Sequence, residues 1–124
     1  MPQHNDIFGF IFACSDDTED ECFEKGLFGG PQRLFQKNRA LEIEAHATKV
    51  FLYNVSSKVL RGPFMAMSRA GTFDHLAWGG QFRCQVRVDV SQAGTVPSIT
   101  VPFARAGDST RASSASRGTT SSRP

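Results

Sequence analysis

Apolar and polar positions alternate most regularly near the beginning of the chain. Between positions 8 and 12 every second residue is a phenylalanine, namely Phe8, Phe10 and Phe12. In an extended strand, residues two apart lie on the same face, so the three rings would point to one side. The residues between them are mostly apolar as well, which is typical of a strand covered on both faces. The pattern therefore predicts a buried strand over residues 7–14.

A helix with a glycine-rich end is predicted directly after this strand. Thr18 is a suitable N-cap, and Glu21 three residues later completes the pattern of a capping box. Acidic side chains crowd the first turn, where they interact favourably with the helix dipole. The run Gly29-Gly30-Pro31 would end the helix. We expect a helix from Thr18 to about Phe28, with its apolar face packed on the strand.

A hairpin is predicted in the middle of the chain. Residues 49–55 include an apolar run of the length and composition of a buried strand. Ser56-Ser57 favours a turn, and residues 58–68 would return as the partner strand. Gly62-Pro63 interrupts this second strand. Because proline has no N–H to donate to a ladder, we expect an edge or a bulge there.

The clearest later strand covers residues 82–90, where apolar and polar residues alternate so that one face would be core and the other polar. The other elements are short: a helical turn over 32–37, a loop over 37–39, a short helix over 73–78 and a weak edge strand over 95–103.

These elements predict an α+β fold, with a mostly antiparallel sheet that is curled or closed into a small barrel and a few short helices. The length of 124 residues suits one domain. We expect a polar lead over residues 1–6, the domain over 7–103 and a Ser/Arg-rich tail over 104–124. The tail has no large apolar residue, so it could not offset an ordering cost of roughly 1–2 kcal/mol per residue and is expected to be disordered.

Four groups of short motifs occur along the chain in a fixed order. They are Gly9-Phe10-Ile11-Phe12 with Cys14, Asp17-Thr18, Glu21-Cys22 and Leu27-Phe28-Gly29; then Val50-Phe51-Leu52-Tyr53-Asn54; then Leu60-Arg61-Gly62-Pro63-Phe64 with Ala66 and Ser68; then Phe82 with Gln85-Val86-Arg87-Val88. In this order and spacing they resemble the DCD (development and cell death) domain of plant proteins, over about residues 8–90. The chain departs from the family pattern at Gly30, where the family has Leu.

The resemblance implies a fold and a role rather than an active site. It implies a non-catalytic interaction module in plant development, stress response and programmed cell death, with an unidentified protein partner. The family-motif residues carried over are structural, since the apolar ones suit a core and the glycines suit tight backbone. They are Gly9, Phe10, Phe12, Leu27, Phe28, Gly29, Phe51, Tyr53, Gly62, Phe64, Gln85 and Arg87. The layout is also similar to PUA-like folds, which include YTH readers of modified RNA.

An RNA-binding alternative depends on one tryptophan and two arginines. Trp78 stands just before the predicted strand whose polar face would carry Arg83 and Arg87. A tryptophan near arginine side chains suits stacking on an unpaired base. A single large ring can equally fill a core. Trp78 is therefore either a core residue or, with Arg83 and Arg87, part of an RNA contact in a PUA-like domain.

Side chains that could support catalysis or bind a metal lack companion motifs. None of His4, His46 and His75 stands beside a Ser or Cys nucleophile in a recognisable motif, and we interpret them as surface imidazoles. The acidic run over 16–24 lacks the alternating ligands of an EF-hand loop, and there is no Gly-rich phosphate loop. We expect no enzyme, no cofactor and no metal.

Three cysteines, Cys14, Cys22 and Cys84, form no Cys-x-x-Cys pair. An odd number without such a pair fits a reducing compartment. We interpret them as buried free thiols. A redox-sensing pair of Cys14 and Cys22 is the alternative, if one thiol is exposed and has a lowered pKa.

Charge and hydropathy bear on the compartment of the protein but identify no partner. The net charge is +2, too mild to indicate nucleic acid by itself. No apolar run approaches the roughly 18 residues of a membrane helix, and the first residues lack the features of a signal peptide. We expect an intracellular protein, in the cytosol or nucleus, with no membrane association. The sequence predicts no oligomeric state.

Overall fold

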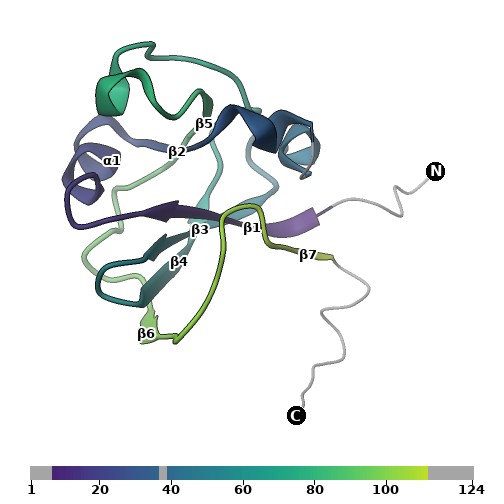
Figure 1. Cartoon of the computed structure of the whole chain (residues 1–124). Helices are drawn as coiled ribbons and strands as arrows, with labels where there is room; N and C mark the ends of the chain where they lie inside the picture. Colours follow the sequence, from purple (N-terminus) through teal and green to yellow (C-terminus); the bar gives the residue numbers. More distant parts are fainter. Residues whose placement is uncertain (1–6, 37–38, 112–124) are drawn as a thin grey trace.

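The computed structural model describes residues 7–36 and 39–111 (Figure 1). The strands are β1 (Ile7–Cys14), β2 (Leu27–Gly30), β3 (Lys49–Asn54), β4 (Val59–Met65), β5 (Cys84–Arg87), β6 (Ser98–Thr100) and β7 (Ser109–Arg111). The helices are the α-helix α1 (Glu19–Lys25) and the 3-10 helices η1 (Gln32–Phe35), η2 (Ala40–Glu42) and η3 (Ala77–Gly80).

The strands form two sheets that meet at one corner. The larger sheet has the order β6-β4-β3-β1-β7, and the smaller one pairs β2 with β5. An isolated bridge between Ala66 and Val88 links the chain after β4 to the chain after β5, so the sheets curl toward each other without closing into a barrel. The predicted α+β class with a mostly antiparallel, curled sheet is confirmed.

One pair in the larger sheet is parallel. β1 and β3 run in the same direction, with Phe10 beside Val50 and Phe12 beside Leu52. A parallel pair needs a crossover of a dozen or more residues. Here the crossover contains α1, β2, η1 and η2, and Figure 1 shows that these elements lie together on one side of the large sheet.

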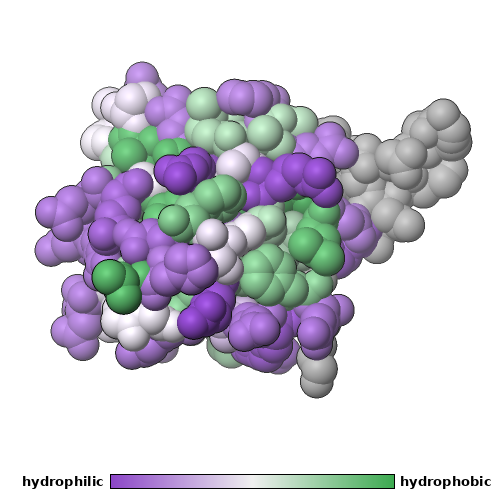
Figure 2. All heavy atoms as spheres, turned by 90° about the horizontal axis from the view of Figure 1, so that it is seen from above, coloured by the Kyte–Doolittle hydropathy of each residue, from purple (hydrophilic) through white to green (hydrophobic). Residues whose placement is uncertain are grey.

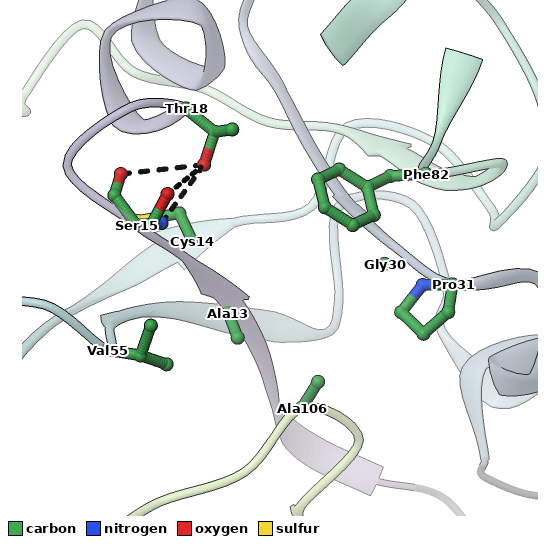
Figure 3. Close-up of a pocket in the computed structure, with 9 residues that line it drawn as sticks. All are labelled: Ala13, Cys14, Ser15, Thr18, Gly30, Pro31, Val55, Phe82 and Ala106. Atoms are coloured by element: carbon green, nitrogen blue, oxygen red, sulfur yellow. Dashed lines mark hydrogen bonds between the residues drawn. The ribbon is translucent and has the colours of Figure 1, made fainter. Parts of the chain in front are cut away.

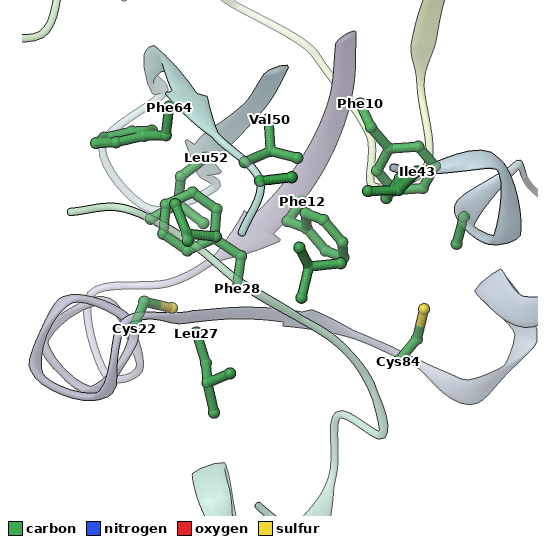
Figure 4. Close-up of a cluster of buried hydrophobic side chains, with 14 of the residues drawn as sticks. Phe10, Phe12, Cys22, Leu27, Phe28, Ile43, Val50, Leu52, Phe64 and Cys84 are labelled. Atoms are coloured by element: carbon green, nitrogen blue, oxygen red, sulfur yellow. The ribbon is translucent and has the colours of Figure 1, made fainter. Parts of the chain in front are cut away.

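The core lies between the large sheet and the elements of that crossover (Figure 4). Phe12 of β1 and Phe64 of β4 both contact Phe28 of β2, with ring centroids 6.4 and 5.2 Å apart. Edge-on aromatic contacts of this kind add to the free energy of burial. Phe10 and Phe12 are both fully buried, which confirms the predicted strand. The side chain of Phe8 lies outside the described part of the structure.

The predicted helix over 18–28 is too long. Helix α1 ends at Lys25, and Gly26 follows it with a left-handed φ of 66° while its N–H bonds to the carbonyl of Cys22. Leu27–Gly30 then forms β2, paired with β5. The helix interpretation failed because buried residues such as Leu27 and Phe28 fit a helical face and a strand equally well, and only pairing with a distant strand decides.

The predicted capping box is also wrong. The Oγ1 atom of Thr18 accepts a hydrogen bond from the N–H of Ser15, at 3.0 Å, instead of capping α1. The Oε2 atom of Glu21 accepts from the N–H of Trp78, at 2.9 Å. Glu21 therefore accepts from a residue far along the chain instead of from the N–H of Thr18, as a capping box would require.

The predicted hairpin is confirmed as β3 and β4, an antiparallel pair. The pairing shifts by one residue between Val50 and Leu52, which places the expected bulge beside Gly62. β4 lies between β3 and β6 rather than at the edge of the sheet. Gly62 has a φ of 150°, and a Cβ there would overlap the ring of Phe51, so this position requires glycine.

The short elements of the second half differ from the predictions. The strand predicted over 82–90 is reduced to β5, and the helix predicted over 73–78 is replaced by η3. The turn predicted over 32–37 corresponds to η1, while residues 37 and 38 of the expected loop lie outside the described residues. The weak edge strand is confirmed as β6, which pairs with β4 at one edge of the large sheet.

The first part of the predicted tail is folded against β1. The N–H of Ile11 donates to the carbonyl of Asp108, at 2.8 Å, and the N–H of Gly107 donates to the carbonyl of Ile11, at 2.7 Å. β7 continues this pairing. Composition missed the contact because it is made by the main chain, not by large side chains. Residues 112–124 of the tail and the lead over 1–6 lie outside the described residues.

Candidate functional site

A cavity of about 190 Å³ opens to the surface at the carboxyl end of β1 (Figure 3). Its lining is largely apolar and comes from separate segments of the chain: Ala13, Cys14, Ser15, Thr18, Gly30, Pro31, Val55, Phe82 and Ala106. Figure 3 shows Phe82 and Pro31 on one side of the space and Ala13 on the other. Sequence reasoning missed this site, since no local pattern connects segments that only the fold brings together.

The edge of β1 is open beside this cavity. Successive residues of a strand direct their N–H and C=O groups to opposite edges. The carbonyl of Cys14 accepts from the N–H of Val55, at 2.8 Å, so Cys14 faces β3, whereas Ile11 faces Gly107 and Asp108. Ala13 therefore faces the same edge as Ile11. There, within the described ranges, no residue bonds to its N–H or C=O.

An acidic turn borders the same cavity. Asp16 and Asp17 are exposed and lie between Ser15 and Thr18, which both line the space. The Oδ1 atom of Asp16 accepts from Nδ2 of Asn54, at 3.0 Å. This bond holds the turn beside the end of β3, while Asp17 is exposed between two residues of the cavity lining.

The three thiols are buried and free, which confirms the favoured interpretation. Hydrogen bonding to Cys22, together with burial, raises the pKa of the Cys14 thiol far above its ordinary range. Burial raises the pKa of Cys84 to about 12. Because the thiolate is the reactive form, Cys14 and Cys84 are poor nucleophiles at neutral pH. Cys14 and Cys22 are both buried, so the redox alternative lacks the exposed thiol that it needs.

Gln85 was predicted on the polar face of its strand, but only 1% of the residue is exposed. Its Oε1 atom accepts from the N–H groups of Phe73 and Asp74, at 2.7 and 2.9 Å. Its Nε2 atom donates to the carbonyls of Asp74 and Phe82, at 2.8 and 3.0 Å. One buried amide thus fixes the loop before η3 to the start of β5, and alternation alone could not reveal this role.

The three residues of the RNA alternative do not form one exposed surface. Trp78 is only 5% exposed, and its ring lies against Gly29, where a Cβ atom would be 2.6 Å from Cζ3 of the indole. The guanidinium of Arg87 lies over the ring of Phe73, 4.7 Å from its centroid. Arg83 is exposed. Trp78 therefore packs in the core, and its burial leaves no free ring face for a base.

The remaining family-motif residues support the fold. The hydroxyl of Tyr53 donates to the carbonyl of Val101, at 2.7 Å, which ties β3 to the segment after β6. Phe51 is half-buried. The other residues of the set are buried: Gly9, Phe10, Phe12, Leu27, Phe28, Gly29, Gly62 and Phe64. None of these residues suggests a catalytic role.

The rest of the surface is mixed. Seen from above, Figure 2 shows hydrophobic atoms gathered in the middle of one face, with hydrophilic atoms around them. A smaller hollow of about 100 Å³ is lined by Phe51, Leu60, Gly62, Pro97 and Ile99. Single exposed apolar residues are ordinary in folded proteins, so exposure alone does not mark a site.

His46 and His75 are exposed, as expected of surface imidazoles, and His4 lies outside the described residues. Among residues 7–36 and 39–111, no three His, Cys, Asp or Glu side chains are grouped so that they could hold a metal ion. In the same part of the chain, no helix has the length and apolarity needed to cross a membrane.

Comparison with known proteins decides the family. A sequence model of the family described as "Development and cell death domain" matches residues 8–102. The chain belongs to the development and cell death (DCD) domain family. No solved structure matches the chain.

Several plant proteins are similar to this chain over part of their own length. The B2 protein of Daucus carota is 36% identical over 96 residues, which are 71% of this chain and 45% of the relative. The DCD domain-containing protein NRP-B of Glycine max is 38% identical over 96 residues, again 71% of this chain but 28% of the relative. The DCD domain-containing protein NRP of Arabidopsis thaliana is 38% identical over 72 residues, which are 58% and 20% of the two chains. The chain therefore spans less than half the length of these relatives.

Proposed function

We propose that this DCD domain is a non-catalytic module that binds a protein partner, and that it serves in plant development, stress response and programmed cell death. The observation that carries the proposal is the apolar cavity beside an open strand edge at Ala13. A cavity and an unpaired edge offer two complementary means of holding another polypeptide. The development and cell death role is supported by the family description and by its plant relatives.

The chemistry of the site favours binding over catalysis. The cavity holds one thiol, Cys14, whose raised pKa keeps it protonated. The other polar side chains of its lining are Ser15 and Thr18, and Thr18 is engaged with the main chain of Ser15. A hydroxyl needs an adjacent base to become a nucleophile, and the lining supplies none.

RNA binding is the competing function, and the burial of Trp78 gives it no structural support. We place the domain inside the cell, in the cytosol or nucleus, on the basis of its odd number of cysteines and the absence of a Cys-x-x-Cys pair. The partner, in this proposal, is a protein that shares that compartment.

An affinity pull-down from plant extract, with and without nuclease, tests the proposal. The full chain is immobilised, and resin carrying the denatured chain serves as the control. We expect a set of proteins retained by the folded chain only and unchanged by nuclease. Loss of every retained protein on nuclease treatment would mean that RNA mediates the binding. Equal retention by the denatured chain would also contradict the proposal.

A further inference from the structure

We propose that the open end of β1 binds an extended peptide segment of the partner as an added strand. One side chain of leucine or phenylalanine size would enter the cavity, and a lysine or arginine would lie near Asp17. This inference rests on the proposed function, because it names the chemistry of the protein partner. It depends on three features of one place: the strand edge, the cavity and the acidic turn.

The edge of β1 that faces away from β3 is already paired over most of its length. β7 pairs antiparallel with the first part of β1, and Gly107 and Asp108 continue the pairing at Ile11. Within the described ranges, the residues immediately before Gly107 make no such bonds to β1. The N–H and C=O of Ala13, the next residue that faces this edge, are therefore unpaired. A peptide in the antiparallel direction would extend the line of β7 and bond to the N–H and C=O of Ala13. Addition of a strand to an open sheet edge is a common mode of peptide recognition.

The size of the cavity limits which side chain of the peptide can enter it. Its volume of about 190 Å³ is slightly larger than the roughly 150 Å³ of an engineered apolar cavity that accepts benzene. A leucine or phenylalanine side chain therefore fits. Figure 3 shows the apolar side chains of Val55, Phe82 and Ala106 around the space, from three separate segments. Their apolar surface favours an apolar side chain over a polar one.

Charge complementarity specifies the neighbouring residue. Asp17 is exposed at the rim, and Asp16 is already bonded to Asn54. A lysine or arginine of the peptide that lies beside this turn would form a surface ion pair. Such pairs contribute little and are screened by salt, so the charge would select between peptides rather than supply most of the affinity.

A selection with random heptapeptides displayed on phage tests the inference on the full chain. We expect enriched peptides to share one Leu, Ile, Val or Phe with a Lys or Arg close by. A synthetic peptide from the selection is then compared with its Leu→Ala or Phe→Ala version. Burial of such a side chain predicts about a 10- to 100-fold loss of affinity. Methylation of the main-chain nitrogen that bonds to Ala13 should also weaken binding, whereas methylation at the peptide's end should not.

Two pairs of matched variants locate the binding site. Ala106→Leu would fill the cavity from its rim, and Ala47→Leu makes the same change at an exposed alanine outside the cavity. We expect the first to weaken binding of the synthetic peptide by at least about tenfold and the second to leave it unchanged. Asp17→Lys should weaken binding several-fold at low salt, while Glu24→Lys, a charge change on α1 outside the cavity lining, should not.

The outcomes separate this inference from the proposed function. If no peptide is enriched, or if Ala106→Leu binds the peptide as well as the unchanged chain, the strand-addition inference is wrong. The proteins retained in the pull-down could still establish a protein-binding role through another surface. The NMR spectrum of the main-chain amides shows whether Ala106→Leu folds. If it does not fold, the methylated peptides and the pair of Asp17→Lys and Glu24→Lys decide the question.

Discussion

The two ends of β1 belong to one strand but have different surroundings. Over most of its length, up to Phe12, β1 is closed: Phe10 and Phe12 are fully buried, one edge pairs with β3 and the other with the segment that contains β7. At its end, β1 is still paired with β3, but the edge that Ala13 faces is open beside a cavity. A main-chain group without a partner is tolerated where solvent can reach it, and Ala13 is only half-buried.

This difference shows how one element can serve stability and binding at once. The closed end uses large aromatic side chains that contact the opposite layer, such as Phe12 against Phe28. The open end carries the small side chains of Ala13 and Cys14, followed by Ser15, and all three line the cavity. We therefore expect substitutions at the closed end to change the free energy of unfolding, and those at the open end to change binding with little effect on stability.

The largest expected effect is at the closed end. Phe12→Ala removes a fully buried ring and leaves a cavity between β1 and β2, so we expect a loss of about 3–5 kcal/mol in the free energy of unfolding. Val55→Ala changes a residue that follows β3 and lines the cavity beside the open end of β1. Because Val55 is 46% exposed, this substitution should cost less than about 1 kcal/mol. Urea unfolding measures both. Similar losses for the two variants would contradict the proposed division of β1.

The buried amide of Gln85 should give the next largest effect. Gln85→Ala leaves the N–H groups of Phe73 and Asp74 and two carbonyls without their partner. Unsatisfied buried groups cost about 1–3 kcal/mol, so we expect a loss of that order. Gln81→Ala, at an exposed glutamine, is the matched control and should be neutral. Urea unfolding midpoints would reveal the difference, and equal midpoints would mean that water replaces these bonds freely.

A smaller effect should appear in acid. Hydrogen bonding from Lys25, at 2.9 Å, lowers the pKa of Asp74 below its ordinary value. A carboxyl with a lowered pKa in the folded state adds stability above its unfolded pKa, about 3.9, and that stability is lost as the pH falls through the folded pKa. We expect Asp74→Asn to reduce the loss of stability below about pH 4. Thermal unfolding from pH 6 to pH 2 measures this, with Asp20→Asn as a control; an unchanged pH profile in Asp74→Asn would be evidence against the ion pair.

The smallest expected effect concerns the thiols. Cys14 lines the cavity, yet its thiol is buried and its pKa is raised. We expect iodoacetamide at pH 8 to leave Cys14, Cys22 and Cys84 unmodified in the folded chain and to modify all three in urea. Mass spectrometry counts the modified sites. Rapid modification of Cys14 in the folded chain would mean that the cavity exposes more of β1 than the structure shows.

Sequence patterns predicted the parts of the fold that depend on local alternation. The strand with Phe10 and Phe12 and the hairpin with its bulge at Gly62 both follow from spacing and from backbone limits. The end of α1 and the existence of β2 could not be predicted, because Leu27 and Phe28 satisfy either conformation until β5 supplies a pairing partner. Folding of Gly107 onto β1 was missed for a related reason, since main-chain pairing leaves no mark in side-chain composition.

The candidate site was less predictable than the fold. Ala13 and Ala106 are small residues far apart in the sequence, and only their position around the same cavity gives them a role. Trp78 was predicted to be either a core residue or part of an RNA contact, and the structure packs it on Gly29. The single tryptophan is therefore a core residue, while the proposed binding site consists of residue types that are common along the chain.

Amide hydrogen exchange at Ala13 tests the central claim most directly. In the free chain we expect the Ala13 N–H to exchange at least about tenfold faster than that of Ile11, which is bonded to Asp108, and that of Cys14, which faces β3. Addition of a selected peptide should slow exchange at Ala13 and leave the other two unchanged. An Ala13 amide as protected as that of Ile11 in the free chain would show that this edge is closed, and the proposed binding site would be lost with it.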